Sequence, residues 1–272
     1  AHDHLFNAIG VGAVSPGVCS NAVGTTEGLT VCLGSRRLPL DTISGNNISC
    51  EPFVLPGTFN TVAWHNTAGA MLNWYAGILF PNIRDTADIV QKLRQLDTQC
   101  SRTPSRLMVL PHFSGATTNH MDDRSRGAIV GLSLSTTREE LYKALLEGTA
   151  YEIKLIFHAL ESAGVSTERM IVSGGGSHSL PWLQTKADVL GKQIIRSACA
   201  QSGALGMAML SAVVCGCYQS LQDAANIMIK QSECIEPVMR NYAIYQERFS
   251  VYRQLYGRLS DINHLLNGNI DD

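Results

Sequence analysis

Residues 168–191 read ERMIVSGGGSHSLPWLQTKADVLG, and this stretch organises the second half of the chain. The apolar run at 170–172 predicts a buried strand, and Gly174, Gly175 and Gly176 predict a tight turn that leads into a helix. Bare backbone at a helix N-terminus lets a ligand approach unpaired N–H groups and the partial positive charge of the helix. The stretch therefore indicates either a nucleotide site or a simple bend between packed elements.

The ends of the predicted helix carry residue types that helix termini prefer. Ser177 and Ser179 are good N-cap residues, and Pro181 fits the first turn, where its missing N–H costs little. Gly191 fits the position just past the end of the helix. A strand, a glycine turn and a helix are therefore expected in succession.

Composition indicates a globular protein with a substantial core. Of the 272 residues, 45% are hydrophobic and 16% are charged, and we expect one domain over residues 1–272. The formal net charge of -2 implies no basic face, so no nucleic-acid partner is expected. No apolar run approaches the ~20 residues that span a membrane, so no membrane partner is expected either.

The eight cysteines are scattered, and several of them, such as Cys32 and Cys215, lie within apolar runs. This usage is typical of reduced, buried thiols in a cytoplasmic protein, and it predicts a cytoplasmic location. Cys215 and Cys217 have the wrong spacing for a zinc knuckle. The chain begins with Ala1 rather than Met, and we expect it to be part of a longer protein.

Hydrophobic patterns predict a mixed order of helices and strands. A short strand after Cys19 and a strand at 29–33 flank a Gly-Thr-Thr-Glu-Gly turn and predict a hairpin. Residues 34–57 are rich in turn formers and predict a loop with at most short strands. Further strands are expected at 60–64, 107–110 and 192–196, and helices at 68–75, 85–99, 138–163, 204–218, 223–229 and 238–266.

Two of these helices carry more specific expectations. Thr136 and Thr137 each precede a glutamate by three residues, which is the capping-box pattern for the helix at 138–163. We expect that helix to bury one stripe of its surface. The helix at 204–218 has small and apolar residues on all sides, which is typical of a helix buried against a sheet. The alternation of helices and strands predicts α/β layers around a mixed sheet.

The glycine turn does not fit a dinucleotide-binding loop. Gly174 and Gly176 match the first two glycines of that fingerprint, but Ser179 stands at the third position. Arg196 stands about twenty residues on, where an acid would bind the ribose of NAD. A Rossmann fold is therefore not expected.

Two further polar clusters have functional and plain readings. His2 and His4 could bind a metal, and side chains two residues apart share a face of a strand but not of a helix. No further set of carboxylates and histidines is evident in the sequence, so no metal site is expected. Asp3 could be a general base at the start of a helix, or a plain helix cap. The hairpin turn offers backbone N–H groups and the hydroxyls of Thr25 and Thr26 to a phosphate, although a plain turn explains it equally.

The order of these three signals resembles the C-terminal domain of the FGGY carbohydrate kinases. This family contains glycerol, xylulose, gluconate and ribulose kinases and belongs to the actin-like ATPase superfamily. The most specific match is residues 127–147, GAIVGLSLSTTREELYKALLE. The positions that match the family signature are Gly127, Gly131, Glu140, Leu141, Ala144 and Glu147. Leu145 departs slightly from the smaller residues usual in the family.

Other family elements follow at similar spacing. The three glycines at 174–176 and then Gln184, Ala187, Asp188, Leu190 and Gly191 resemble the adenosine motif, and residues 204–208 resemble the Ala-Leu-Gly-x-Ala segment after it. Residues 1–3 resemble the Gly-x-x-Asp element, and residues 24–26 resemble the Gly-Thr-Ser phosphate turn. The resemblance covers nearly the whole chain, more loosely over 34–106.

The resemblance implies an α/β actin-like ATPase (ribonuclease H-like) fold, with a mixed sheet flanked by helices. It implies ATP-dependent phosphorylation of a sugar or polyol hydroxyl, with Asp3 as the catalytic base. The residues implied to bind ATP are Gly24, Thr25 and Thr26 at the phosphates, Gly174, Gly175, Gly176 and Ser177 at the adenosine, and Gly115 near the nucleotide.

The resemblance also implies a missing half. A family kinase is about twice as long, and its N-terminal domain carries a phosphate loop, the Mg²⁺-binding carboxylates and most sugar-binding residues. We therefore expect this chain to need its own N-terminal domain, and to be nearly inactive alone. The uncovered edge would expose apolar surface, which could support a homodimer. The alternative function is an actin-like nucleotide-binding module without sugar kinase activity.

Overall fold

The computed structural model describes residues 2–199 and 201–267. The helices are α1 (Asp3–Val11), α2 (Leu40–Asn46), α3 (Gly69–Leu79), α4 (Thr86–Gln99), α5 (Arg138–Ser162), α6 (Leu180–Leu190), α7 (Ser202–Val214), α8 (Leu221–Met228) and α9 (Met239–Asn267), with a 3₁₀ turn η1 (Gly175–His178). The strands are β1 (Gly17–Val23), β2 (Glu27–Gly34), β3 (Glu51–Pro52), β4 (Phe59–His65), β5 (Met108–Leu110), β6 (Ala128–Val130), β7 (Thr167–Ser173), β8 (Ile194–Ser197) and β9 (Gln231–Ile235).

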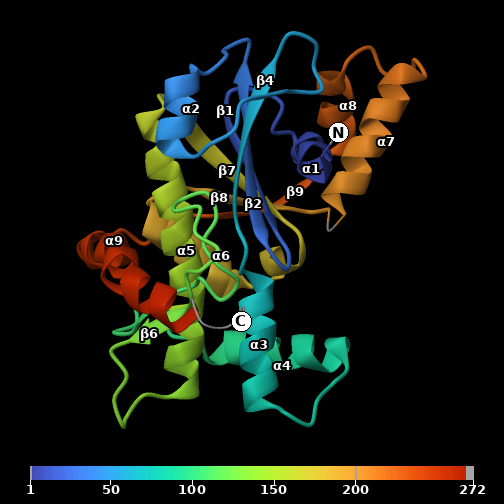
Figure 1. The fold of residues 1–272 in the computed structure, drawn as a ribbon. Helices are drawn as coiled ribbons and strands as arrows, with labels where there is room; N and C mark the ends of the chain where they lie inside the picture. The colour runs from blue at the N-terminus through green and yellow to red at the C-terminus, as the bar shows by residue number, and fades with distance from the viewer. Residues whose placement is uncertain (1, 200, 268–272) are drawn as a thin grey trace.

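A mixed sheet forms the centre of the fold (Figure 1). Its strands lie in the order β3-β4-β2-β1-β7-β8-β9. β1 and β2 form the predicted antiparallel hairpin, and β7 runs parallel to both β1 and β8. The hairpin and the mixed sheet predicted from the sequence are therefore confirmed.

Each face of the sheet has its own hydrophobic cluster, as strand periodicity requires. Along β7, Met170 and Val172 pack on the side of α5 and α6, whereas Ile171 packs on the opposite side with α1, α7 and α8. α9 crosses outside α5 and adds a third cluster with Tyr151 (Figure 1). The sheet is thus a layer between helices. Because helices cover both faces, a site is expected at the ends of the central strands.

Helix α5 is buried more completely than one stripe. Thr137 and Glu140 form the predicted capping box, while the side chain of Thr136 bonds to Ser133 instead of capping. Charged side chains such as Lys143 and Glu152 are buried along with the apolar ones. The expected stripe is buried, and further sides of the helix are buried as well because α6 and α9 also pack around it.

Two other expectations are wrong. Residues 34–57 contain α2 as well as the short strand β3, because Pro39 begins the helix and Asn47, at φ 49°, ends it. α7 is not enclosed against the sheet: it buries Ser202, Gly206 and Met209, chiefly against α1, and much of its remaining surface is exposed. Its small residues serve a close helix–helix contact. β6 and β9 are strands that the sequence patterns did not indicate.

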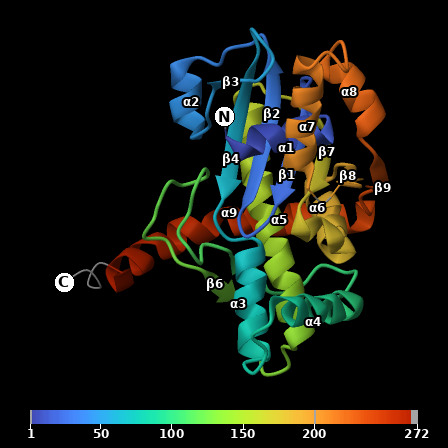
Figure 2. The same ribbon diagram turned by 90° about the vertical axis from the view of Figure 1, so that its right-hand side faces the viewer.

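Helices α3 and α4 project from one end of the sheet, beyond the tips of the central strands (Figure 2). α3 begins four residues after β4 ends, so its N-terminus is held close to that end of the sheet. Helices α3 and α4 therefore form a wall opposite the glycine turn.

Within the described ranges, no helix has the length and apolar character needed to cross a membrane.

Candidate active site

The glycine turn lies where β7 ends. Gly174 has φ +85°, and a Cβ atom there would lie 2.6 Å from the carbonyl oxygen of Val23. A Cβ atom at Gly176 would collide with the Val23 side chain and lie 2.8 Å from the Trp182 ring. The turn therefore packs directly on the end of β1 and presents bare backbone there, which only glycine permits.

Two serines hold this turn in place. Ser179 is the N-cap of α6, and its side chain accepts a hydrogen bond from the N–H of Trp182, as predicted. The hydroxyl of Ser177 instead donates to the carbonyl oxygen of Gly174 at 2.7 Å, and the Ser177 side chain is buried. The prediction that Ser177 is an N-cap is therefore wrong, because Ser177 lies within η1 and Ser179 caps the helix.

The tip of the β1–β2 hairpin lies against the N-terminus of α3. The carbonyl oxygen of Gly24 accepts a hydrogen bond from the N–H of Gly69 at 2.9 Å, and that of Thr25 accepts two more from the same helix end at 3.1 Å. These bonds use the carbonyl oxygens of the tip and fix its position. The side chains of Thr25 and Thr26 remain exposed, so their hydroxyls can bind a ligand.

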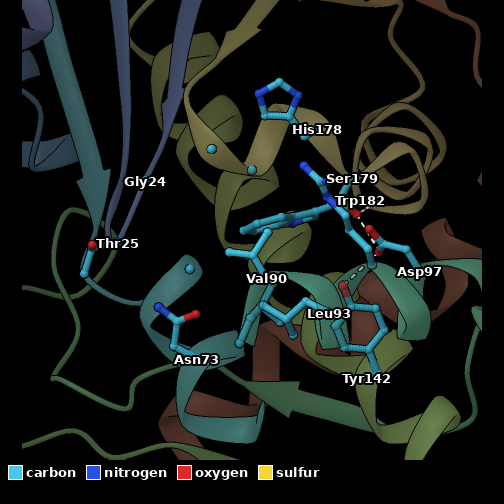
Figure 3. A pocket seen from close by; sticks show the side chains of 15 residues that line it. Gly24, Thr25, Asn73, Val90, Leu93, Asp97, Tyr142, His178, Ser179 and Trp182 are labelled. Atoms are coloured by element: carbon cyan, nitrogen blue, oxygen red, sulfur yellow. Dashed lines mark hydrogen bonds between the residues drawn. The ribbon is translucent and has the colours of Figure 1, made fainter. Parts of the chain in front are cut away.

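The hairpin tip and the glycine turn line one cavity of about 370 Å³ (Figure 3). This volume falls in the range of roughly 300–1,000 Å³ that is usual for small-molecule sites. Gly24, Thr25, Gly175 and Gly176, which lie about 150 residues apart in two groups, all face it. The structure thus brings together two turns that the sequence singled out separately.

Other predicted site residues do not line this cavity. Thr26 lies in the same hairpin tip, and Gly174 and Ser177 pack within the glycine turn. Gly115 has φ +78° in the loop between β5 and β6, where a Cβ atom would lie 3.1 Å from the backbone of Asp123. The positive φ and this close contact explain why residue 115 is a glycine.

The sequence reading missed the wall formed by α3, α4 and α5. The missed lining residues that carry chemistry or flat apolar surface are Asn73, Val90, Leu93, Arg94, Asp97 and Tyr142. The helix expected at 85–99 is confirmed as α4, but the sequence patterns did not indicate that it lines a site. The spacing of Val90, Leu93 and Asp97 along one helix face was the signal that could have indicated a ligand wall.

Asp97 is the carboxylate that faces this cavity. Its Oδ1 accepts hydrogen bonds from the hydroxyl of Ser179 at 2.7 Å and from the hydroxyl of Tyr142 at 2.8 Å (Figure 3). Burial raises the pKa of the Asp97 carboxyl above its usual value, and these two hydrogen bonds offset part of that rise. Asp97 therefore ties α4 to α5 and α6 at the cavity wall.

Asp3 lies in the first turn of α1, outside the cavity lining, and its side chain is 90% exposed. Its Oδ1 accepts from the N–H of His4 at 2.9 Å and lies 3.0 Å from His2 Nδ1. The His4 ring packs directly on Gly28, just after the hairpin tip. The start of α1 is thereby fixed beside β2, which begins directly after Thr26.

Of the two geometries considered for the histidines, the structure shows one in which their rings lie together. His2 is the N-cap, in an extended conformation outside the helix, so its ring stacks on the His4 ring with centroids 5.0 Å apart. The ligand atoms of His2, Asp3 and His4 lie within 4.8 Å of one another. Two imidazoles and one carboxylate do not fit Mg²⁺, which prefers oxygen ligands, so no step is assigned to Mg²⁺ at this cluster.

A buried charge cluster lies directly beneath the hairpin tip. Glu27 follows Thr26, and its Oε1 pairs with Lys186 of α6 while its Oε2 lies 3.0 Å from His65 Nε2. Burial alone would raise the pKa of the Glu27 carboxyl, but Lys186 and His65 outweigh burial and lower it to about 2. The ionised Glu27 therefore connects the hairpin tip to the helix that follows the glycine turn.

Known proteins resemble this chain in sequence and in fold. The model of the FGGY family of carbohydrate kinases, C-terminal domain, matches residues 19–215. A xylulose kinase of Staphylococcus epidermidis is 26% identical over 254 residues, which cover 93% of this chain and 49% of that protein. A ribulokinase of Anoxybacillus flavithermus is 29% identical over 262 residues, which cover 91% of this chain and 45% of that protein.

The structural likeness agrees with the sequence match. The crystal structure of xylulose kinase from Rhodospirillum rubrum matches with a TM-score of 0.83 and 25% identity, over 97% of this chain and 51% of that chain. The predicted fold class, an α/β actin-like ATPase (ribonuclease H-like) fold with a mixed sheet flanked by helices, is confirmed. The chain spans about half the length of the curated relatives it matches.

Proposed function

This chain belongs to the FGGY family of carbohydrate kinases, and from that premise we propose that it supplies the ATP-binding half of a kinase that phosphorylates a sugar or polyol hydroxyl. The observation that carries the proposal is that Gly24 and Thr25 face the same cavity as Gly175 and Gly176. A phosphate turn and a bare-backbone turn that line one cavity suit the phosphates and the adenosine of a nucleotide.

In this proposal the hairpin tip binds the β- and γ-phosphates. The carbonyl oxygens of Gly24 and Thr25 already accept hydrogen bonds from the N-terminal end of α3, so they do not repel an anion as unpaired carbonyls would. The hydroxyls of Thr25 and Thr26 add neutral donors. Gly175 and Gly176 let the adenosine lie against the backbone, with the Trp182 ring beside it.

Asp3 is proposed as the general base. The two contacts of its carboxylate, with the N–H of His4 and with His2, both use Oδ1. In residues 2–199 and 201–267 no hydrogen-bond donor pairs with Oδ2, so that oxygen can accept the proton of the attacking sugar hydroxyl. Phosphoryl transfer depends mainly on positioning and charge stabilisation, so one placed carboxylate suits the reaction.

The remaining parts of the reaction belong to a proposed N-terminal domain. We use "complete kinase" for this chain joined to that domain. The Mg²⁺ that accompanies ATP in phosphoryl transfer would bind mainly there, because the His2–Asp3–His4 cluster does not suit it. Most of the sugar site would also lie there, so this chain alone would be nearly inactive.

The alternative, a nucleotide-binding module without sugar chemistry, gives the exposed Asp3 carboxylate no role, and the kinase relatives do not favour it. The two functions separate in one assay. The complete kinase is incubated with ATP and a panel that includes xylulose, ribulose, gluconate and glycerol, and ADP release is measured. Sugar-dependent ADP release supports the kinase. ATP binding without sugar-dependent ADP release on a broad panel would contradict it and support the module.

A further inference from the structure

The cavity has two chemically different ends (Figure 3). Thr25 of the hairpin tip lies at one end, and Asp97 lies at the other, with the side chain of Trp182 near it. A nucleotide has its phosphates at one end, its ribose in the middle and its base at the other. With phosphates at the hairpin tip, as the proposed function has it, the base lies at the end that holds Asp97.

The walls at this end suit a flat ring. Trp182, Leu72, Val90 and Leu93 line the cavity, and most of its lining surface is apolar. Aromatic and aliphatic walls bind a purine by its faces and give little discrimination among purines, because every base has a similar face. Discrimination has to come from a polar group that meets the edge of the ring.

Asp97 is such a group, and its geometry is fixed. Its Oδ1 accepts from Ser179 at 2.7 Å and from Tyr142 at 2.8 Å, so the two hydroxyls hold the carboxylate in one orientation. No donor within residues 2–199 and 201–267 bonds to Oδ2, and Oδ2 is not among the buried side-chain oxygens that lack a partner. Because a carboxylate only accepts hydrogen bonds, the ligand edge at Oδ2 must carry an N–H or O–H donor.

We infer that Asp97 selects the base of the nucleotide, by accepting a hydrogen bond from the exocyclic 6-amino group of adenine and rejecting purines with a 6-oxo group. The inference rests on the proposed function, which places a nucleotide in this cavity. A 6-oxo group would bring a second acceptor against the carboxylate and leave both without a donor. Ribose hydroxyls also donate, but the ribose would lie nearer the glycine turn than Asp97.

The test compares ATP with inosine triphosphate, which differs from ATP by carrying a 6-oxo group. Dissociation constants of both are measured by calorimetry on the complete kinase, as wild type and with Asp97→Asn. An asparagine at this position keeps an acceptor for Ser179 and Tyr142 and turns a donor toward the base. Wild type should prefer ATP by about ten- to hundredfold, and Asp97→Asn should abolish or reverse that preference.

Two further variants make the comparison specific. Asp97→Ala should lose the preference without reversing it. Asp88→Asn makes the same charge change on an exposed position of α4 outside the cavity lining, and it should leave the preference unchanged. A melting temperature for Asp97→Asn at or above that of wild type shows that the fold is intact, because burial disfavours the ionised carboxyl.

Each outcome decides the inference. Equal affinity of wild type for the two nucleotides, or an unchanged preference in Asp97→Asn, overturns it while leaving the proposed function standing. If Asp97→Asn instead changes the preference between ATP and 2′-deoxy-ATP, Asp97 binds the ribose and the inference is wrong. If the complete kinase binds neither ATP nor inosine triphosphate, the proposed function fails and the inference fails with it.

Discussion

Lys186 and Glu27 form an ion pair in which both side chains are fully buried, and this pair joins helix α6 to the residue after the hairpin tip. His65 of β4 bonds to the other carboxylate oxygen at 3.0 Å. The pair connects the two turns that face the cavity, one through Glu27 and the other through the helix that begins after Ser179. The relative position of the two turns therefore depends on a buried electrostatic contact.

We expect Lys186→Met to destabilise the protein by about 3–5 kcal/mol, because it leaves the Glu27 carboxylate buried without its main partner. The double change Glu27→Gln with Lys186→Met should recover much of that loss, since no charge remains unpaired. Lys92→Met is the control: Lys92 has no ion pair within the described residues and should change stability by less than about 1 kcal/mol. Urea unfolding measures all three. A cost for Lys186→Met equal to that of the control would contradict the assignment.

The same ion pair makes the free energy of unfolding depend on pH in the acidic range. The pKa of the Glu27 carboxyl falls from 4.5 to about 2 on folding, so the folded state binds fewer protons than the unfolded state between these values. The stabilisation is complete above pH 4.5 and is lost as the pH falls toward about 2. The loss of unfolding free energy in this window should be smaller in Glu27→Gln than in wild type. An equal loss of unfolding free energy in the two proteins over this pH range would show that Glu27 does not titrate in this way.

The strand, turn and helix at 167–191 could be predicted because each is specified by adjacent residues: an apolar run, three glycines, and the caps Ser179 and Gly191. Asp97 could not be predicted as a site residue. Its hydrogen-bond partner Ser179 is 82 residues away, and α4 taken alone reads as a surface helix. The wall exists only once α4 packs beside α5 and α6.

Glu27 and Glu147 are two further residues whose roles depend on partners that are distant in the sequence. Glu27 read as one residue of a hairpin turn, although its partner Lys186 lies 159 residues further along. Glu147 is part of the family motif, but its buried carboxylate accepts from Ser105 N–H and the Tyr245 hydroxyl, away from the cavity lining. Motif membership therefore did not distinguish a residue that supports the fold from one that faces the ligand.

The bare backbone at Gly175 can be tested without disturbing the fold. A Cβ atom there would meet nothing within 4 Å, yet Gly175 lines the cavity. We expect Gly175→Ala to keep the melting temperature of wild type and to weaken ATP binding about tenfold, because the methyl group would occupy space needed by the adenosine. Gly257→Ala on α9, which also has open space around it, should leave ATP affinity unchanged. Unchanged ATP affinity in Gly175→Ala would show that the adenosine does not bind at this turn.

Substitution of Asp3 tests the central claim most directly. Asp3→Asn in the complete kinase is compared with wild type for sugar-dependent ADP formation and for ATP affinity, with Asp41→Asn, an exposed carboxylate in the first turn of α2, as the control. General-base catalysis contributes typically ~10²–10⁴-fold, so we predict a loss of turnover of about 10³-fold in Asp3→Asn, ATP affinity within about twofold of wild type, and no loss in the control. Turnover of Asp3→Asn within about tenfold of wild type would contradict the account.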